Sequence, residues 1–397
     1  MVVIKGVSAK HILDSRREKT IFVSVHTNTG KFSASSPTGK STGKYEVEPY
    51  KKGLEKDIEI LKKFRDYFSD EIIDNFFDLR RIEDIVEGHI GANSLFALES
   101  AVLKALAIEK KKQIWQLINP ELSKTTRRFP RLVGNCVGGG KHSQGYLQRK
   151  RPDFQEFLLI PKTNSVKNAF EVNKKAKKEI SYLLKEKDEK FESKKNYEDA
   201  WETSLNEKEI LDILKNLKIP LGIDIAASVF YKRKKYYYQN PVLQRTKEEQ
   251  FYYISNLIKN FGLSYIEDPF DEEDFESFTK LLKKFQNTLI VGDDLTATNY
   301  KRLAKAIEMK SINALIVKPN QNGSLLEVAK VCELAKKKNI KIVFSHRSGE
   351  TEENILADLA FGFQADFFKA GITGKEREIK IRRLIEIEKR LRLSRGL

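Results

Sequence analysis

The chain has 397 residues, of which 40% are hydrophobic, and it carries a formal net charge of +17. This length allows two domains with a sizeable core, and no apolar run approaches the roughly 18 residues needed to span a membrane. The N-terminus has no apolar stretch of signal-peptide length. Two cysteines, Cys136 and Cys332, are too few for a disulfide framework and are expected to be buried thiols. We therefore expect a soluble, cytoplasmic protein that does not enter a membrane.

The positive charge raises nucleic acid as a partner, because basic surfaces release counterions from a phosphate backbone. The lysines, however, are spread along the chain, and the densest stretch, residues 172–195, mixes them with acids. Apolar residues recur there at helical spacing, at Ile180, Leu183 and Leu184, which predicts a helix with a solvated charged face. No zinc-finger or aromatic RNA-binding motif is present. We therefore do not expect nucleic acid to be a partner.

Residues 1–125 have the pattern of a small α+β domain. Strand-like residues 20–35 contain Asn-Thr-Gly, a hairpin-turn signal, and helical patterns follow from Gly53 to Leu117. From about Arg131 onward, short apolar runs alternate with amphipathic helices, which is typical of βα units around a parallel sheet, open or closed into a barrel. The sequence predicts an α/β protein with an N-terminal α+β domain, residues 1–125, and a β/α domain, residues 126–397.

Polar residues end the apolar runs of the second domain. From Glu267 onward they recur every 23 to 28 residues, about the length of one βα repeat, so successive strands would deliver them to the same face. In a barrel this face is the C-terminal rim, where active sites are built. We therefore expect a shared site formed by Asp224, Glu267, Asp293, Lys318, His346 and Lys369.

The chemistry of these residue types indicates a metal-assisted proton abstraction. Asp224, Glu267 and Asp293 would repel one another unless a cation lay between them, and oxygen ligands select a hard ion such as Mg²⁺. A poorly solvated lysine beside the metal, Lys318 or Lys369, loses its proton more easily and can act as a base. This combination suits removal of a proton next to a carboxylate, because the metal stabilises the enolate that forms.

Residues 345–353, Ser-His-Arg-Ser-Gly-Glu-Thr-Glu-Glu, contain an anion-binding pattern. Arg347 is always charged and can form two hydrogen bonds with phosphate oxygens, and Ser348 can donate another. Gly349 allows the loop to close tightly. The substrate is therefore expected to carry a phosphate as well as a carboxylate.

Several motifs resemble those of enolase, in order and with similar spacing over nearly the whole chain. They are SPTGKSTGKYE, GGGKH, DFQEF, YIEDPFDEEDFE, VGDDLTATN, LIVKPNQNG and SHRSGETEE. The resemblance implies an enolase-like fold, in which a small N-terminal α+β domain precedes a ββαα(βα)6-type barrel. It also implies a lyase that interconverts 2-phosphoglycerate, a phosphorylated hydroxy acid, and phosphoenolpyruvate in glycolysis and gluconeogenesis. A homo-oligomer, a dimer or larger, is expected. The ion pair that commonly joins subunits in this family is not expected here, because Phe22 and Glu386 stand near its two positions.

The resemblance further implies which residues bind metal and substrate. Asp224, Glu267 and Asp293 would hold a first Mg²⁺, and Ser41 would complete a second Mg²⁺ site that forms with the substrate. The substrate carboxylate would be bound by Lys369, and the phosphate and hydroxyl regions by Arg347, Ser348, His346, Glu156 and His142.

The catalytic groups follow from the same resemblance. Lys318 would be the base, and Glu156 and His142 would stand near the leaving hydroxyl. The general acid of the family is a glutamate in an Asp-Glu-Gly-Gly segment, which is replaced here by Asn-Tyr-Glu-Asp-Ala-Trp-Glu at residues 196–202. We predict that Glu198 is the acid, with Glu202 as the alternative.

Two other interpretations remain open in the sequence. Residues 38–42, Thr-Gly-Lys-Ser-Thr, match the end of a phosphate-binding P-loop. That motif requires a glycine where Ala34 stands and a helix immediately afterwards, whereas Gly43 follows. The altered acid loop and the high charge also allow an enolase-like protein with another role, either a lyase for a different carboxylic acid or a non-catalytic binding protein, including one for nucleic acid.

Overall fold

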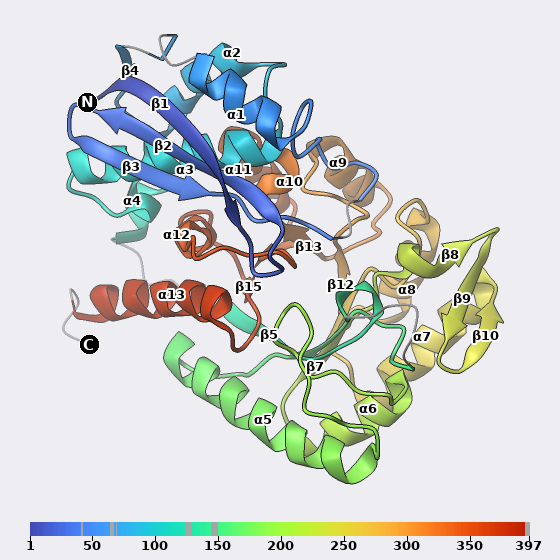
Figure 1. Cartoon of the computed structure of the whole chain (residues 1–397). Helices are drawn as coiled ribbons and strands as arrows, with labels where there is room; N and C mark the ends of the chain where they lie inside the picture. Colours follow the sequence, from blue (N-terminus) through green and yellow to red (C-terminus); the bar gives the residue numbers. More distant parts are fainter. Residues whose placement is uncertain (41–42, 64–66, 69, 124–128, 144–149, 394–397) are drawn as a thin grey trace.

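The computed structural model describes residues 1–40, 43–63, 67–68, 70–123, 129–143 and 150–393. A β-sheet with helices forms the N-terminal part, and it lies against one side of a closed β/α barrel formed by the rest of the chain (Figure 1). The predicted boundary between residues 125 and 126 falls outside the described residues. The predicted fold, a small α+β domain followed by a barrel, is confirmed.

The N-terminal sheet is antiparallel and has the strand order β3-β2-β1-β4. Residues 28 and 29 form the predicted hairpin turn between β2 and β3. Helix α3 packs against β2 and β3 on one side and against the barrel segment α10 on the other, so it is buried on nearly all sides. The strands are β1 (Val2–Leu13), β2 (Lys19–Thr27), β3 (Gly30–Ser35) and β4 (Glu71–Ile73). The helices are α1 (Leu54–Lys63), α2 (Leu79–Val86), α3 (Ala92–Glu109) and α4 (Ile114–Ile118).

The barrel closes in the order β11-β12-β13-β14-β15-β5-β6-β7. Only β6 runs antiparallel to its two neighbours, and two helices separate it from β7, which gives the predicted ββαα(βα)6 arrangement. The strands are β5 (Arg131–Gly138), β6 (Glu156–Leu159), β7 (Leu221–Asp224), β11 (Tyr265–Glu267), β12 (Leu289–Gly292), β13 (Ala314–Val317), β14 (Lys341–Ser345) and β15 (Phe367–Lys369). The main helices are α5 (Val166–Lys187), α6 (Glu207–Leu214), α7 (Lys247–Phe261), α8 (Phe275–Lys284), α9 (Tyr300–Glu308), α11 (Leu325–Lys337), α12 (Ile355–Gly362) and α13 (Lys375–Leu393), with the short α10 (Pro319–Asn322) after β13.

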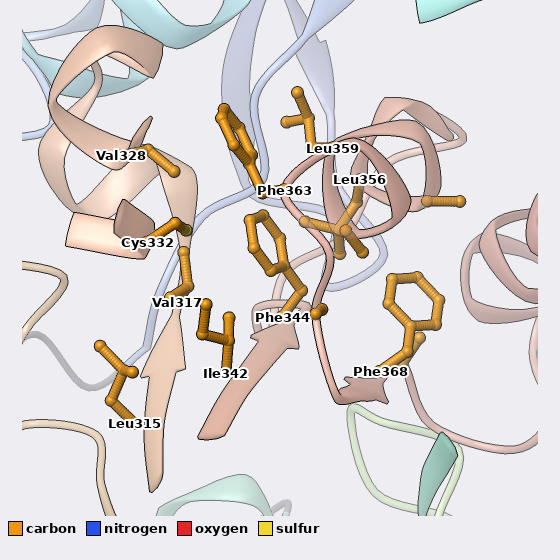
Figure 2. Close-up of a cluster of buried hydrophobic side chains, with 14 of the residues drawn as sticks. Leu315, Val317, Val328, Cys332, Ile342, Phe344, Leu356, Leu359, Phe363 and Phe368 are labelled. Carbon is orange, nitrogen blue, oxygen red and sulfur yellow. The ribbon is translucent and has the colours of Figure 1, made fainter. Parts of the chain in front are cut away.

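The barrel strands are buried on both faces, which explains their continuous apolar sequences. In β13, Ala314 and Ile316 belong to the cluster inside the barrel. Leu315 and Val317 point the other way, toward the helices, where Val317 lies near Cys332 of α11 (Figure 2). Cys136 is also a buried free thiol, as predicted.

A three-stranded sheet between β7 and α7 was not predicted. It consists of β8 (Tyr231–Lys232), β9 (Lys235–Gln239) and β10 (Val242–Arg245), and it protrudes at the edge of the barrel (Figure 1). The turn between β8 and β9 places both Arg233 and Lys234 at positive φ. Since neither residue is the glycine or asparagine that such turns favour, the sequence gives no usual hairpin signal here.

Two sequence expectations are tested directly by the fold. Residues 43–53 form turns and bends, and α1 begins only at Leu54, so the P-loop interpretation is wrong. Helix α5 spans most of the lysine-rich stretch, with Ile180 and Leu184 buried as predicted. Lys177 of the same helix is nevertheless only 3% exposed, so its charged face is not entirely solvated. No helix of the described residues is long and apolar enough to cross a bilayer.

Candidate active site

The strand register brings the predicted polar residues to one rim of the barrel. Asp224, the last residue of β7, lies opposite Glu267 of β11 and Glu156 of β6. Glu156 is the first residue of β6, and it reaches this rim because β6 is antiparallel to its neighbours. Lys369 lies at the end of β15. The remaining members directly follow the ends of β12, β13 and β14: Asp293, Lys318 and His346.

Three carboxylates converge as the sequence predicted. Ligand oxygens of Asp224, Glu267 and Asp293 lie within 4.8 Å of one another, and all three residues are buried. The Lys369 ammonium lies among carboxylates, with Nζ 3.0 Å from Asp224 Oδ2, 2.8 Å from Glu267 Oε1 and 3.0 Å from Glu156 Oε2. Burial, followed by the Asp224 carboxylate, raises the pKa of Glu267 to about 8. The position between the carboxylates therefore favours positive charge.

Lys318 and Asp293 form an ion pair beside this cluster. Burial acts to lower the pKa of Lys318, but the Asp293 carboxylate outweighs burial, and the net pKa is raised. For Asp293 the balance is reversed: burial acts to raise the pKa, and the Lys318 ammonium makes the net pKa low. The second oxygen of Asp293, Oδ1, is buried and has no hydrogen-bond partner among the described residues.

These residues fit a hard divalent cation. All three ligand side chains offer carboxylate oxygens, which Mg²⁺ prefers over nitrogen and sulfur ligands. The unpartnered Asp293 Oδ1 supplies a lone pair that is already desolvated. Ser41, the predicted ligand of a second ion, lies outside the described residues.

A second buried cluster surrounds Glu198. His142 Nδ1 lies 3.4 Å from Glu198 Oε1 and 3.5 Å from Glu156 Oε1, and His346 Nε2 lies 3.5 Å from Glu198 Oε2. Asn135 of β5 donates a hydrogen bond from Nδ2 to Glu198 Oε2 at 3.0 Å. Glu198 is 2% exposed, so the loop that differs most from the family pattern still delivers a carboxylate to this site.

The pKa values of Glu156 and Glu198, the two carboxyls of this cluster, are shifted in opposite directions. Burial and the nearby Glu198 charge raise the pKa of Glu156 well above its usual value. Burial acts the same way on Glu198, but His142 and His346 outweigh it, and the net pKa of Glu198 is well below its usual value. Burial also lowers the pKa of both histidines. Between these two carboxyls, the shifts therefore favour a proton on Glu156 over one on Glu198.

The predicted phosphate clamp is closed by the N-terminal loop. Lys40 donates a backbone hydrogen bond to Ser348 Oγ at 2.9 Å. The Arg347 guanidinium makes an ion pair with Glu46, with Nη1 to Oε2 and Nη2 to Oε1 distances of 2.9 and 3.1 Å. A Cβ atom added to Gly39 would lie only 1.9 Å from Arg347 Nη2, so a larger residue here would displace the guanidinium from this position.

One pocket joins these groups. It is lined by nine predicted residues, Lys318, Lys369, Asp224, Glu156, Glu198, His142, His346, Arg347 and Ser348, together with Gly39, Gln155 and Ser345. Glu202, the alternative acid, does not line it and lies instead beside a separate surface pocket with Phe191 and Lys194.

The sequence interpretation assigned no role to Glu46, Asn135 or Gly39. Glu46 and Gly39 belong to the SPTGKSTGKYE motif, so their contact with Arg347 had a sequence signal that was not used. Asn135 is central in β5, whose sequence contains two glycines and was not recognised as a strand.

Comparisons with known proteins agree with this geometry. A family model described as "Enolase, N-terminal domain" matches residues 4–118, and one described as "Enolase, C-terminal TIM barrel domain" matches residues 127–394. The enolase of Methanosphaera stadtmanae is 35% identical over 412 aligned residues, covering 98% of this chain and 97% of that protein. The enolase of Pyrobaculum aerophilum is 34% identical, covering 89% of this chain and 87% of that protein. The enolase of Sulfurisphaera tokodaii is 35% identical, covering 97% and 95%. The chain therefore belongs to the enolase family.

Proposed function

We propose that this enzyme, a lyase of the enolase family, reversibly dehydrates 2-phospho-D-glycerate to phosphoenolpyruvate in a Mg²⁺-dependent reaction. The observation that carries the proposal is the single pocket that joins Lys318, Glu198, Arg347 and the Asp224 carboxylate. A base, an acid, a phosphate ligand and a metal ligand are the groups that this elimination requires.

The first step is removal of the proton at C2 by Lys318. Mg²⁺ held by Asp224, Glu267 and Asp293 would supply positive charge to the carboxylate oxygens of the enolate. Lys318 must leave its ion pair with Asp293 and be neutral before it accepts a proton. Lys369 is the second lysine of the pocket, and we assign it to the substrate carboxylate. To bind the substrate, Lys369 must release its present partners, the carboxylates of Asp224 and Glu267.

The second step is departure of the C3 hydroxide with a proton from Glu198. The lowered pKa of Glu198 favours its ionised form in the free protein, so the proposed step requires that Glu198 gain a proton in the reacting state. Glu156 belongs to the same cluster, and its raised pKa favours the protonated form, so we assign it as the source of that proton. His142 lies between the two carboxylates and is assigned to the region of the leaving hydroxyl.

The phosphate is assigned to Arg347, Ser348 and His346. Arg347 offers a planar set of donors that matches a phosphate, and this set is presently taken by Glu46. We further assign a second Mg²⁺, which arrives with the substrate, to Ser41, and we expect a homo-oligomer.

The test is to mix the protein with 2-phosphoglycerate and Mg²⁺ and to follow phosphoenolpyruvate by its ultraviolet absorbance. We expect product that disappears after exhaustive chelation and returns when Mg²⁺ is restored. A folded protein that binds Mg²⁺ and forms no phosphoenolpyruvate would refute the proposed reaction. Formation that persists without a divalent ion would refute the metal assignment alone.

A further inference from the structure

The loop that carries Glu198 is a tight turn closed on Asn196. Asn196 Oδ1 accepts hydrogen bonds from the backbone N–H of Glu198, at 2.9 Å, and of Ala200, at 3.0 Å. The backbone N–H of Asn196 donates to the Ala200 carbonyl at 2.9 Å. Asp199, at the tip of this turn, has φ +62°, in the left-handed region that favours glycine. A non-glycine residue persists in this conformation only when its surroundings hold it there.

The Asp199 side chain is held by Lys195, just before the turn, and by two residues from other parts of the chain, Lys177 and Thr373. Lys177 Nζ of helix α5 lies 2.9 Å from Asp199 Oδ2, and Lys195 Nζ lies 3.0 Å from Oδ1. Thr373, in the loop after β15, donates its hydroxyl to Asp199 Oδ2. The Lys177 ammonium also donates to Thr373 Oγ1 and to the Asp199 carbonyl. One carboxylate thus joins the Glu198 loop to α5 and to the segment that follows Lys369.

Lys177 is the unusual member of this group. It is 3% exposed, and burying an ammonium group is unfavourable unless it is paired and hydrogen-bonded. The backbone carbonyl of Lys177 accepts a hydrogen bond from the indole Nε1 of Trp201 at 2.8 Å. The backbone N–H of Trp201 donates to the Cys136 carbonyl of β5 at 3.0 Å. The segment that follows Glu198 is therefore fixed to both α5 and β5.

We propose that Asp199, held by Lys177 and Thr373, is a positioning residue that keeps the Glu198 carboxylate aimed into the active-site pocket. This inference rests on the proposed function, because it assigns Glu198 the elimination step. It predicts that loosening Asp199 impairs departure of the hydroxide and leaves proton removal by Lys318 largely intact, since Lys318 directly follows β13 and does not belong to this loop.

The alternative is that the Asp199–Lys177 pair only stabilises the fold. A purely structural pair would affect both steps equally, because both steps use the same folded pocket. Separate measurement of deuterium exchange at C2 and of phosphoenolpyruvate formation distinguishes the two roles.

The experiment compares four variants with the unaltered protein. Asp199→Gly together with Lys177→Met removes the contact without leaving a buried ammonium unpaired. Asp199→Asn keeps an acceptor and tolerates positive φ, so it is the conservative variant. Asp70→Gly is the matched control, because Asp70 is an exposed aspartate with φ +66° in the N-terminal domain. Lys177→Met alone removes the ammonium group that pairs with Asp199 and leaves the Asp199 carboxylate in place.

Two readouts are used, of which one needs no activity. Hydrogen–deuterium exchange of the amides of residues 196–201 should be at least about tenfold faster in the double variant and unchanged in Asp70→Gly. Phosphoenolpyruvate formation should fall about 10- to 100-fold in the double variant, while C2 exchange stays within about threefold, since small misplacements of a catalytic group have effects of this size. Asp199→Asn should retain more elimination activity than the double variant.

Unchanged amide exchange in the 196–201 segment would overturn the inference, as would an equal loss of elimination and C2 exchange. If the unaltered protein forms no phosphoenolpyruvate, the proposed function fails, and the inferred role in catalysis fails with it. Amide exchange would then still show whether Asp199 holds the loop. If the unaltered protein is active and the Asp199 variants match it in every readout, the positioning role is wrong and the proposed function is unaffected.

Discussion

Glu46 and Arg347 are 301 residues apart in sequence, and their side chains form an ion pair between the N-terminal loop and the end of β14. Both are almost fully buried, with exposed side-chain fractions of 8% and 4%. Because the Arg347 guanidinium is the expected phosphate ligand, Glu46 competes with the phosphate for the same donors. A carboxylate of the protein thus stands where we expect a phosphate of the substrate.

Glu46→Gln should therefore strengthen phosphate binding. Removing the competing charge should lower the inhibition constant of inorganic phosphate about 3- to 10-fold, which corresponds to roughly 1 kcal/mol, within the range of a hydrogen bond to a charged group. Competitive inhibition kinetics give this constant. Glu48→Gln, a change at an exposed neighbouring glutamate, serves as the control and should leave it unchanged. Weaker phosphate inhibition in Glu46→Gln would mean that Glu46 orients Arg347 instead of competing for it.

Asp293→Asn should weaken binding of the first Mg²⁺ while the fold is retained. Asp293 follows the end of β12, and its side chain belongs to the rim and not to the apolar core. An amide keeps one oxygen ligand but loses the charge that a divalent ion requires. Calorimetric titration with Mg²⁺ measures the effect, with the exposed Asp212→Asn of α6 as control. An isotherm that matches the unaltered protein would remove Asp293 from the metal site.

Lys318→Ala should abolish deuterium exchange at C2 together with turnover, because exchange requires the base. Loss of general-base catalysis typically lowers the rate about 10²- to 10⁴-fold. Exchange is measured by nuclear magnetic resonance of 2-phosphoglycerate in deuterated buffer. The exposed Lys301→Ala of α9 is the control. Exchange that persists in Lys318→Ala would point to Lys369 as the base.

Glu207 makes stability depend on pH. It is 1% exposed at the start of α6, and burial, followed by the Asp153 charge, raises its pKa from 4.5 to about 7. The folded protein therefore holds a proton that the unfolded chain has lost between these values. Stability contributed by the neutral carboxyl decreases as the pH rises from about 4.5 to 7, by about 3 kcal/mol in total.

Glu207→Gln removes this titration and keeps an oxygen that can accept the hydrogen bond from the Asp153 backbone N–H. The free energy of unfolding of the variant, minus that of the unaltered protein, should rise by about 2 to 3 kcal/mol between pH 5 and pH 8. Urea denaturation at both pH values measures the difference. Glu186→Gln, at an exposed position of α5, should show no such gain. A difference that does not change with pH would show that Glu207 is ionised in the folded protein.

The barrel and its rim could be predicted from the sequence because buried parallel strands are continuous apolar runs with polar ends. Residues 314–318 show this directly, since four buried residues precede Lys318. Strand β5 was missed because Gly134 and Gly138 interrupt its apolar run. Gly134 leaves room for Ile372 and Gly138 for Asn196, and these are tertiary reasons that one sequence does not display.

The contacts that cross between distant segments could not be predicted. The burial of Lys177 depends on Asp199 and Thr373, which are 22 and 196 residues away. By periodicity alone Lys177 belongs to a charged helix face. The same limit applies to the choice between Glu198 and Glu202, because both lie in one short segment and only the turn closed by Asn196 directs Glu198 into the pocket.

The most direct test is to measure phosphoenolpyruvate formation and C2 deuterium exchange together in Glu198→Gln and in its matched control, Glu202→Gln. Base and acid act at different carbons, so losing the acid should reduce product formation about 10²- to 10⁴-fold and preserve exchange. Glu202→Gln should behave as the unaltered protein, because Glu202 does not line the active-site pocket. Undiminished product formation in Glu198→Gln, with loss in Glu202→Gln, would contradict the assignment of Glu198 as the acid.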